Sequence, residues 1–131
     1  MAQFLFWIGT YNVIGSIMLA CCLHEGAADL ILRRMTYMVS DPYVHGAFSR
    51  TWMLWAASVN LGLGVVMMYA SRWGVEPMRV VTLASVAGYA IVLIAAITVS
   101  GNPKWGPGLY VGYVLWPAQI GWGVWGFAKS I

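Results

Sequence analysis

The residues able to bind a metal or an axial cofactor are few, and they flank the apolar runs of the sequence. Cys21 and Cys22 lie near the end of the first apolar run, His24 and Glu25 follow it, and His45 precedes the second. His24 and Glu25 are adjacent, so on a helix they point about 100° apart and do not form the chelating pair that two histidines four residues apart would form. A catalytic metal centre takes three or more protein ligands. We therefore predict no metal site.

Polar side chains inside the apolar runs are uncharged at neutral pH. They include Asn12, Ser16, Asn60, Ser85, Tyr89, Thr98, Tyr113 and Gln119. Proton and ion pathways usually contain a buried ionisable residue, so this pattern disfavours an ion-coupled transporter. We interpret Asn12, Asn60 and Gln119 as hydrogen-bonding groups between helices, with a ligand site as the alternative. Serine, histidine and carboxylate never meet at helical spacing, and the sequence therefore predicts no catalytic residue and no enzyme.

Tryptophan and glycine crowd the last apolar run. Trp122 and Trp125 are three residues apart on one predicted helix face, near the end where a membrane protein carries its aromatic belt, and Trp116 lies two turns earlier. Anchoring of these tryptophans at the membrane–water interface explains this pattern without any ligand. We therefore predict no bound cofactor. The alternative is that these tryptophans contact a flat apolar molecule such as a haem, chlorophyll, quinone or sterol, with His24 or His45 as the residue able to ligate it.

The composition is that of an integral membrane protein. The chain has 131 residues, of which 61% are hydrophobic and 8% charged, and its mean hydropathy is +0.76. A soluble domain is about 25% charged. The charged residues all lie between or after the apolar runs. We therefore interpret the net charge of +3 as cations that flank a membrane and favour its anionic headgroups, and we predict no nucleic-acid binding.

The apolar runs predict an all-α fold in one domain, residues 1–131. A membrane-spanning helix takes about 20 residues, and we expect spans over residues 4–23, 51–70, 80–100 and 109–127. The connections are short, so the four spans should form an antiparallel bundle. Residues 27–39 are apolar on one side only, which predicts a short amphipathic helix lying in the interface plane. Lys and Arg are too evenly distributed over the loops to orient the chain.

The most distinctive segment lies at the entrance to the second predicted span. Gly46 stands four residues before the pair Arg50 and Thr51, Trp52 follows at once, and Trp55 comes three residues later. This segment resembles the corresponding one in the ergosterol-biosynthesis scaffold family of small four-helix membrane proteins. The resemblance implies a non-catalytic tether that gathers sterol-modifying enzymes. The third predicted span lacks the His and Glu expected from that family, and the fourth is richer in Trp and Gly.

Contact features dominate the sequence. Those five residues form one predicted docking surface, and Gly108 and Gly112, four residues apart, form a second place where a helix could approach closely. We therefore expect a non-catalytic accessory or scaffold subunit whose partners are membrane lipids and other membrane protein subunits. The alternative is a protein that binds an apolar cofactor or lipid (a pigment, quinone or sterol) within a membrane redox or photosynthetic assembly.

Overall fold

The computed structural model describes residues 1–37, 47–99 and 106–131, most of which are helical. In chain order the helices are α1 (Ala2–Cys21), α2 (Glu25–Ala28), the π-helix η1 (Asp29–Met35), α3 (Ala47–Ala70), α4 (Val75–Val99) and α5 (Leu109–Ala128). The three described segments contain no β-strand. The predicted all-α fold is therefore confirmed.

Three helices have the length and apolar composition needed to cross a membrane. They are Ala2–Cys21, Met53–Ala70 and Val75–Thr98. The fourth long helix, α5, also has 20 residues, but it is not among them. Its Trp, Tyr, Gly and Pro residues are less hydropathic than the aliphatic residues that fill α4. The chain is thus a candidate membrane protein on the strength of three helices.

The helices begin earlier than the apolar runs suggest. α3 starts at Ala47, so Arg50 lies within its first turn instead of ahead of it, and α4 starts at Val75 instead of residue 80. Pro77 is in the first turn of α4, where its missing amide hydrogen costs no helical hydrogen bond. Polar residues are tolerated at such ends because they leave the membrane core, and hydropathy alone therefore underestimates the helix length.

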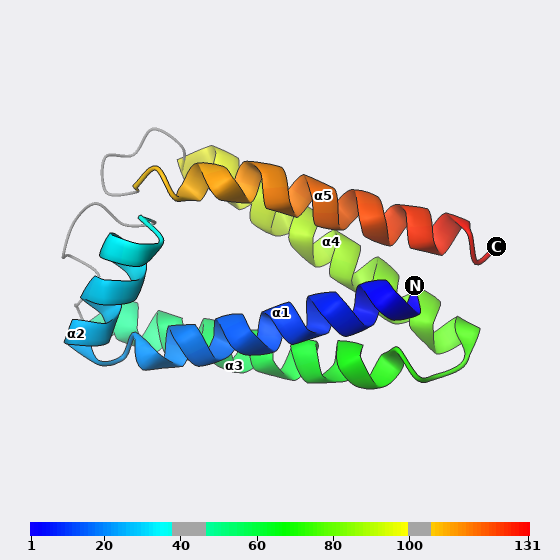
Figure 1. Cartoon of the computed structure of the whole chain (residues 1–131), viewed down its shortest axis with the longest axis horizontal. Helices are drawn as coiled ribbons and strands as arrows, with labels where there is room; N and C mark the ends of the chain where they lie inside the picture. The colour runs from blue at the N-terminus through cyan, green and yellow to red at the C-terminus, as the bar shows by residue number, and fades with distance from the viewer. Residues whose placement is uncertain (38–46, 100–105) are drawn as a thin grey trace.

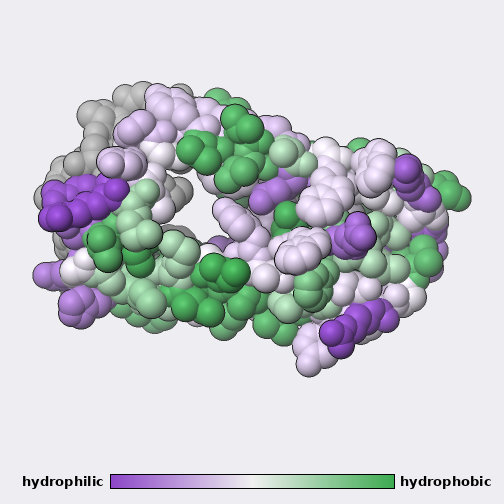
Figure 2. All heavy atoms as spheres, viewed as in Figure 1, coloured by the Kyte–Doolittle hydropathy of each residue, from purple (hydrophilic) through white to green (hydrophobic). Residues whose placement is uncertain are grey.

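The four long helices form two antiparallel pairs, α1 with α3 and α4 with α5 (Figure 1). The pairs meet at the end that holds both termini, which we call the closed end (residues 1–5, 67–82 and 122–131). Phe4, Leu5, Met67 and Ala70 are fully buried there. The pairs diverge toward the other end, which we call the open end (residues 16–37, 53–61 and 106–112). The divergence leaves an opening between α5 and α1 that is visible in the space-filling view (Figure 2).

A short irregular helix stands between the pairs at the open end. The prediction of one amphipathic helix over residues 27–39 is correct in kind but wrong in detail, because a single turn of α2 passes into the π-helix η1, which ends at Met35; residues 38 and 39 lie outside the described part. Ala28 and Leu32 are buried as the pattern predicts. Met35 is 62% exposed, since the wider π-turn changes which residues share a face.

Both ends of this irregular segment, α2 with η1, are tied to the bundle. Its first turns pack through a cluster of Cys22, Ala28 and Leu32 against Met53 of α3. Two residues after η1, Tyr37 accepts a backbone hydrogen bond of 2.8 Å from the amide of Gly108, just before α5. The predicted pair of Asp29 with Arg33 is confirmed at 2.6 Å. The segment therefore acts as a strut between the two helix pairs.

Candidate functional site

The crossing of α1 and α3 depends on Gly64 and on Gly9, the latter missed by sequence reasoning. A Cβ atom built on Gly9 would lie 2.7 Å from the carbonyl oxygen of Gly64, and one built on Gly64 would lie 2.7 Å from the carbonyl oxygen of Gly9. The two backbones are in direct contact, which is how small residues drive helix association in lipid. Because straight helices diverge on both sides of a crossing, this contact also creates a groove on either side of it.

A polar cluster lies beside this crossing, in the middle of the helices. The hydroxyl of Tyr89 on α4 donates to the side-chain oxygen of Asn12 on α1 at 2.7 Å, and the Asn12 amide nitrogen lies 3.6 Å from the sulfur of Met67 on α3. Asn12 and Tyr89 are both more than 90% buried. The prediction that Asn12 bonds between helices is confirmed, and this residue joins the two helix pairs.

Two further polar atoms, one on α4 and one on α5, are buried without a hydrogen-bond partner among the described residues. They are the side-chain oxygens of Thr82 and Gln119. An unpaired acceptor in an apolar interior is costly. Of the predicted interhelical groups, Gln119 therefore has a buried oxygen without a hydrogen-bond partner among the described residues, and the half-buried Asn60 makes no side-chain hydrogen bond to them either.

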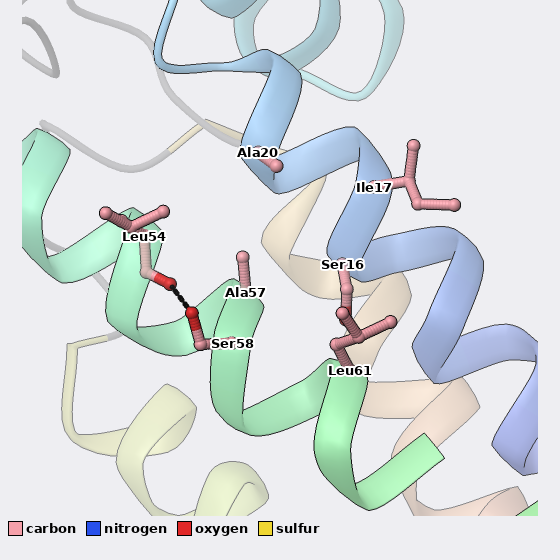
Figure 3. Close-up of a pocket in the computed structure, with 7 residues that line it drawn as sticks. All are labelled: Ser16, Ile17, Ala20, Leu54, Ala57, Ser58 and Leu61. Carbon is pink, nitrogen blue, oxygen red and sulfur yellow. Dashed lines mark hydrogen bonds between the residues drawn. The ribbon is translucent and has the colours of Figure 1, made fainter. Parts of the chain in front are cut away.

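A groove of about 240 Å³ lies between α1 and α3 at the open end (Figure 3). It is lined by Ser16, Ile17 and Ala20 from α1 and by Leu54, Ala57, Ser58 and Leu61 from α3. Both serine hydroxyls are occupied, since Ser16 donates to the Asn12 carbonyl at 2.6 Å and Ser58 to the Leu54 carbonyl at 2.9 Å. The groove thus presents an apolar surface to whatever lies against it.

The three tryptophans that the alternative interpretation assigns to an apolar cofactor do not line a common surface. Trp122 packs edge-to-face on Phe4, with ring centroids 5.8 Å apart, inside the closed end. Trp125 is 57% exposed, and the Lys129 ammonium lies 4.1 Å from the centre of its ring. Trp116 packs against the buried core, and its ring folds back over Gly112 of its own helix. The structure therefore divides them between packing and surface positions.

The candidate ligands are not gathered either. His24 is exposed and precedes the first turn of α2, where its ring lies near Gly26, while His45 is outside the described residues. Cys21 is exposed and Cys22 buried, and both are free thiols. In the part of the chain that the structure describes, no group of three His, Cys, Asp or Glu residues could hold a metal ion. Among the described residues, His24 therefore shares no metal site with another candidate ligand.

The predicted docking residues differ in whether they pack within the chain, are exposed, or lie outside the described residues. Gly112 is occupied by the Trp116 ring, and Gly108 is engaged through its amide with Tyr37, so these two glycines pack within the chain. Trp55 is 63% exposed on α3, near the open end. Gly46 and the side chains of Arg50, Thr51 and Trp52 lie outside the described residues. Of the predicted docking surface, the structure therefore describes only the Trp55 side chain, and it is accessible.

No family model, curated protein or solved structure matches this chain. The resemblance of residues 42–55 to the ergosterol-biosynthesis scaffold family accordingly stays a prediction from the sequence.

Proposed function

We propose that the chain is a non-catalytic accessory or scaffold subunit of a membrane assembly, which binds other membrane proteins by helix packing at its open end. The observation that carries this proposal is the divergence of the two helix pairs (Figures 1 and 2). A bundle whose only role is its own stability would bury its apolar faces by closing. Here a strut stands between the pairs, which is suited to keeping contact surfaces apart and accessible.

We also propose that α5 is a fourth span, as the sequence predicts. Its 20 residues from Leu109 to Ala128 include no charged side chain. At about 1.5 Å per residue they extend about 30 Å, the thickness of the hydrocarbon core. α5 also packs along the whole apolar helix α4. A helix so placed cannot leave the membrane while its partner remains inside it.

The polar groups inside the bundle support a role in protein–protein contacts more than a role in catalysis. The polar groups that the structure brings together are an amide and a phenol, Asn12 and Tyr89, which bond to each other. On α1 and α3 the surface near the open end exposes apolar side chains, with Ile17, Leu54 and Trp55 between 49% and 63% exposed. If the resemblance of residues 42–55 to the scaffold family holds, the partners are enzymes that modify membrane lipids such as sterols.

Site-specific photo-crosslinking in native membranes tests this proposal. A photoreactive residue replacing Leu54, at the open end, should crosslink to one or more defined proteins. The matched control replaces Ile91, which is 67% exposed in the middle of α4 and should react mainly with lipid. Mild detergent purification of the unmodified chain should recover the same partner in stoichiometric amount. Recovery of the chain alone, together with equal crosslinking at both positions, would contradict the proposal.

A second candidate function is binding of an apolar molecule that carries a hydrogen-bond donor. The observation that favours it is the buried oxygen of Gln119, which has no partner. A lipid alcohol or a quinol entering between the pairs would supply a donor, whereas an oxidised quinone offers only acceptors. In that case the purified chain carries the molecule in stoichiometric amount, and Gln119→Leu removes it. Partner proteins without such a molecule favour the scaffold.

A further inference from the structure

A second groove lies between α1 and α3 at the closed end, on the other side of the Gly9 and Gly64 contact. It has a volume of about 220 Å³ and is lined by Phe6, Met68, Tyr69 and Arg72. Phe6 and Met68 supply apolar walls, and Tyr69 is 64% exposed at the rim. Arg72 follows the last turn of α3, at the end of a helix that is long and apolar enough to cross a membrane. The groove therefore combines an apolar floor with a cation at its mouth.

The other described cations of this end are already engaged. Arg79 pairs with Glu76 at 2.5 Å and also donates to the hydroxyl of Ser130 at 3.1 Å. Lys129 lies over the ring of Trp125 at 4.1 Å. Within the described residues, the guanidinium of Arg72 makes no ion pair and no side-chain hydrogen bond. Its charge is thus left without compensation by the protein at the mouth of an apolar groove.

We propose that this groove binds an anionic phospholipid, with the phosphate at Arg72 and the first part of an acyl chain against Phe6 and Met68. Guanidinium groups match phosphate oxygens through two parallel hydrogen bonds, which suits Arg72 to this role. The volume is below the range of about 300–1,000 Å³ typical of pockets that enclose a compact ligand. A segment of an acyl chain fits that size better than a ring system such as a sterol or porphyrin. This site is independent of the open end.

Native mass spectrometry of the whole chain, released from nanodiscs of mixed phosphatidylcholine and phosphatidylglycerol, tests the proposal. The wild type should retain phosphatidylglycerol in preference to phosphatidylcholine. Arg72→Gln should lower the retained phosphatidylglycerol about fivefold, the effect of about one cation at a membrane surface. Lys129→Gln is the matched control, since it removes one cation from the same end without touching the groove, and it should leave retention near the wild-type value.

Two further variants separate the groove from diffuse electrostatics. Phe6→Ala should weaken retention and Phe6→Leu should largely preserve it, because leucine keeps an apolar wall; circular dichroism confirms that each variant is folded. Equal losses for Arg72→Gln and Lys129→Gln, or no loss for Arg72→Gln, would overturn the proposal. So would displacement of the lipid by millimolar inorganic phosphate, because the site would then recognise a free anion instead of a phospholipid.

Discussion

The closed and open ends of the bundle are built from the same helices but held by different contacts. At the closed end, large side chains fit against glycine: Phe4 and Val86 both lie against Gly123. At the open end, the strut packs through the small buried cluster of Cys22, Ala28 and Leu32, and a backbone hydrogen bond between Tyr37 and Gly108 links it to the start of α5. The closed end is held by side-chain packing, whereas the open end is held by the strut.

This difference assigns separate roles to the two ends. Packing of large and small side chains in lipid gives stability, because contact between helices replaces the missing hydrophobic drive. The strut buries few side chains, so it contributes less stability, but it fixes the distance between the two helix pairs. Changes at the closed end and at the α1 and α3 crossing should therefore affect whether the protein folds, while changes at the strut should affect the opening more than the fold.

The largest effect should come from the crossing of α1 and α3. Gly9→Ala or Gly64→Ala places a Cβ against a backbone carbonyl, which no side-chain rotation relieves. We expect a loss of about 1–3 kcal/mol or more, as for overpacked interiors, and separation of the two helices. Unfolding in mixed micelles of increasing SDS fraction measures this change.

Gly15→Ala and Gly62→Ala are matched controls on the same two helices. A Cβ at either position meets nothing within 4 Å, so both variants should be neutral or slightly stabilising. If the crossing variants and these controls gave the same stability, direct backbone contact between α1 and α3 would be wrong.

The next largest effect should come from the polar contact that joins the pairs. Asn12→Leu leaves the Tyr89 hydroxyl without its acceptor, and Tyr89→Phe removes the donor. Each should cost about 0.6–2 kcal/mol, the range for such bonds in membranes. The double variant should cost less than the sum of the two single ones, because the same bond is lost only once. Additive losses in the same SDS titration would show that the two residues do not interact.

Much of this fold was predictable from hydropathy. The three helices long and apolar enough to cross a membrane, the helix after Glu25 and the pair of Asp29 with Arg33 follow from period and spacing, because these patterns depend on neighbours in the sequence. The π-helix was not predictable, since residues 29–35 have ordinary helical spacing and the shift to i+5 bonding becomes visible only in the structure. The positive φ of Tyr37 was equally hidden, because tyrosine rarely adopts it.

The site was predicted less well, and for a physical reason. Asn12 stood out because an amide inside an apolar run needs a partner. Gly9 did not, because glycine is frequent throughout this chain and only its contact with Gly64 across the crossing distinguishes it from Gly15. Gly108 and Gly112 have the spacing of a docking motif, yet Gly112 accommodates Trp116 of its own helix. Spacing therefore identifies a helix face made of small residues, but it does not identify the group that packs against that face.

A smaller effect is expected at the end of the strut. Tyr37 has a φ of 50°, a left-handed conformation that costs a residue with a Cβ about 1–2 kcal/mol. It brings the Tyr37 carbonyl to the amide of Gly108. Tyr37→Gly should therefore be more stable than Tyr37→Val by about 1–2 kcal/mol, because a β-branched residue is least tolerant of this φ. Thermal unfolding of the two variants measures the difference, and a more stable valine variant would place Tyr37 in an extended conformation instead.

The smallest effect is a rate, and it reports whether the base of the strut stays packed. Cys22 is 1% exposed and its thiol donates to the Met18 carbonyl at 3.2 Å, whereas Cys21 is exposed. Burial raises the pKa of the Cys22 thiol, so less of the reactive thiolate is present at neutral pH. In single-cysteine variants, Cys22 should react with a maleimide more slowly than Cys21, and its rate should continue to rise with pH above the ordinary thiol range. Leu32→Ala removes a neighbour from the cluster and should accelerate Cys22 without changing Cys21. Equal rates for the two thiols in the parent chain would mean that the strut does not cover Cys22. The packing of the strut against α3 at the open end would then be wrong.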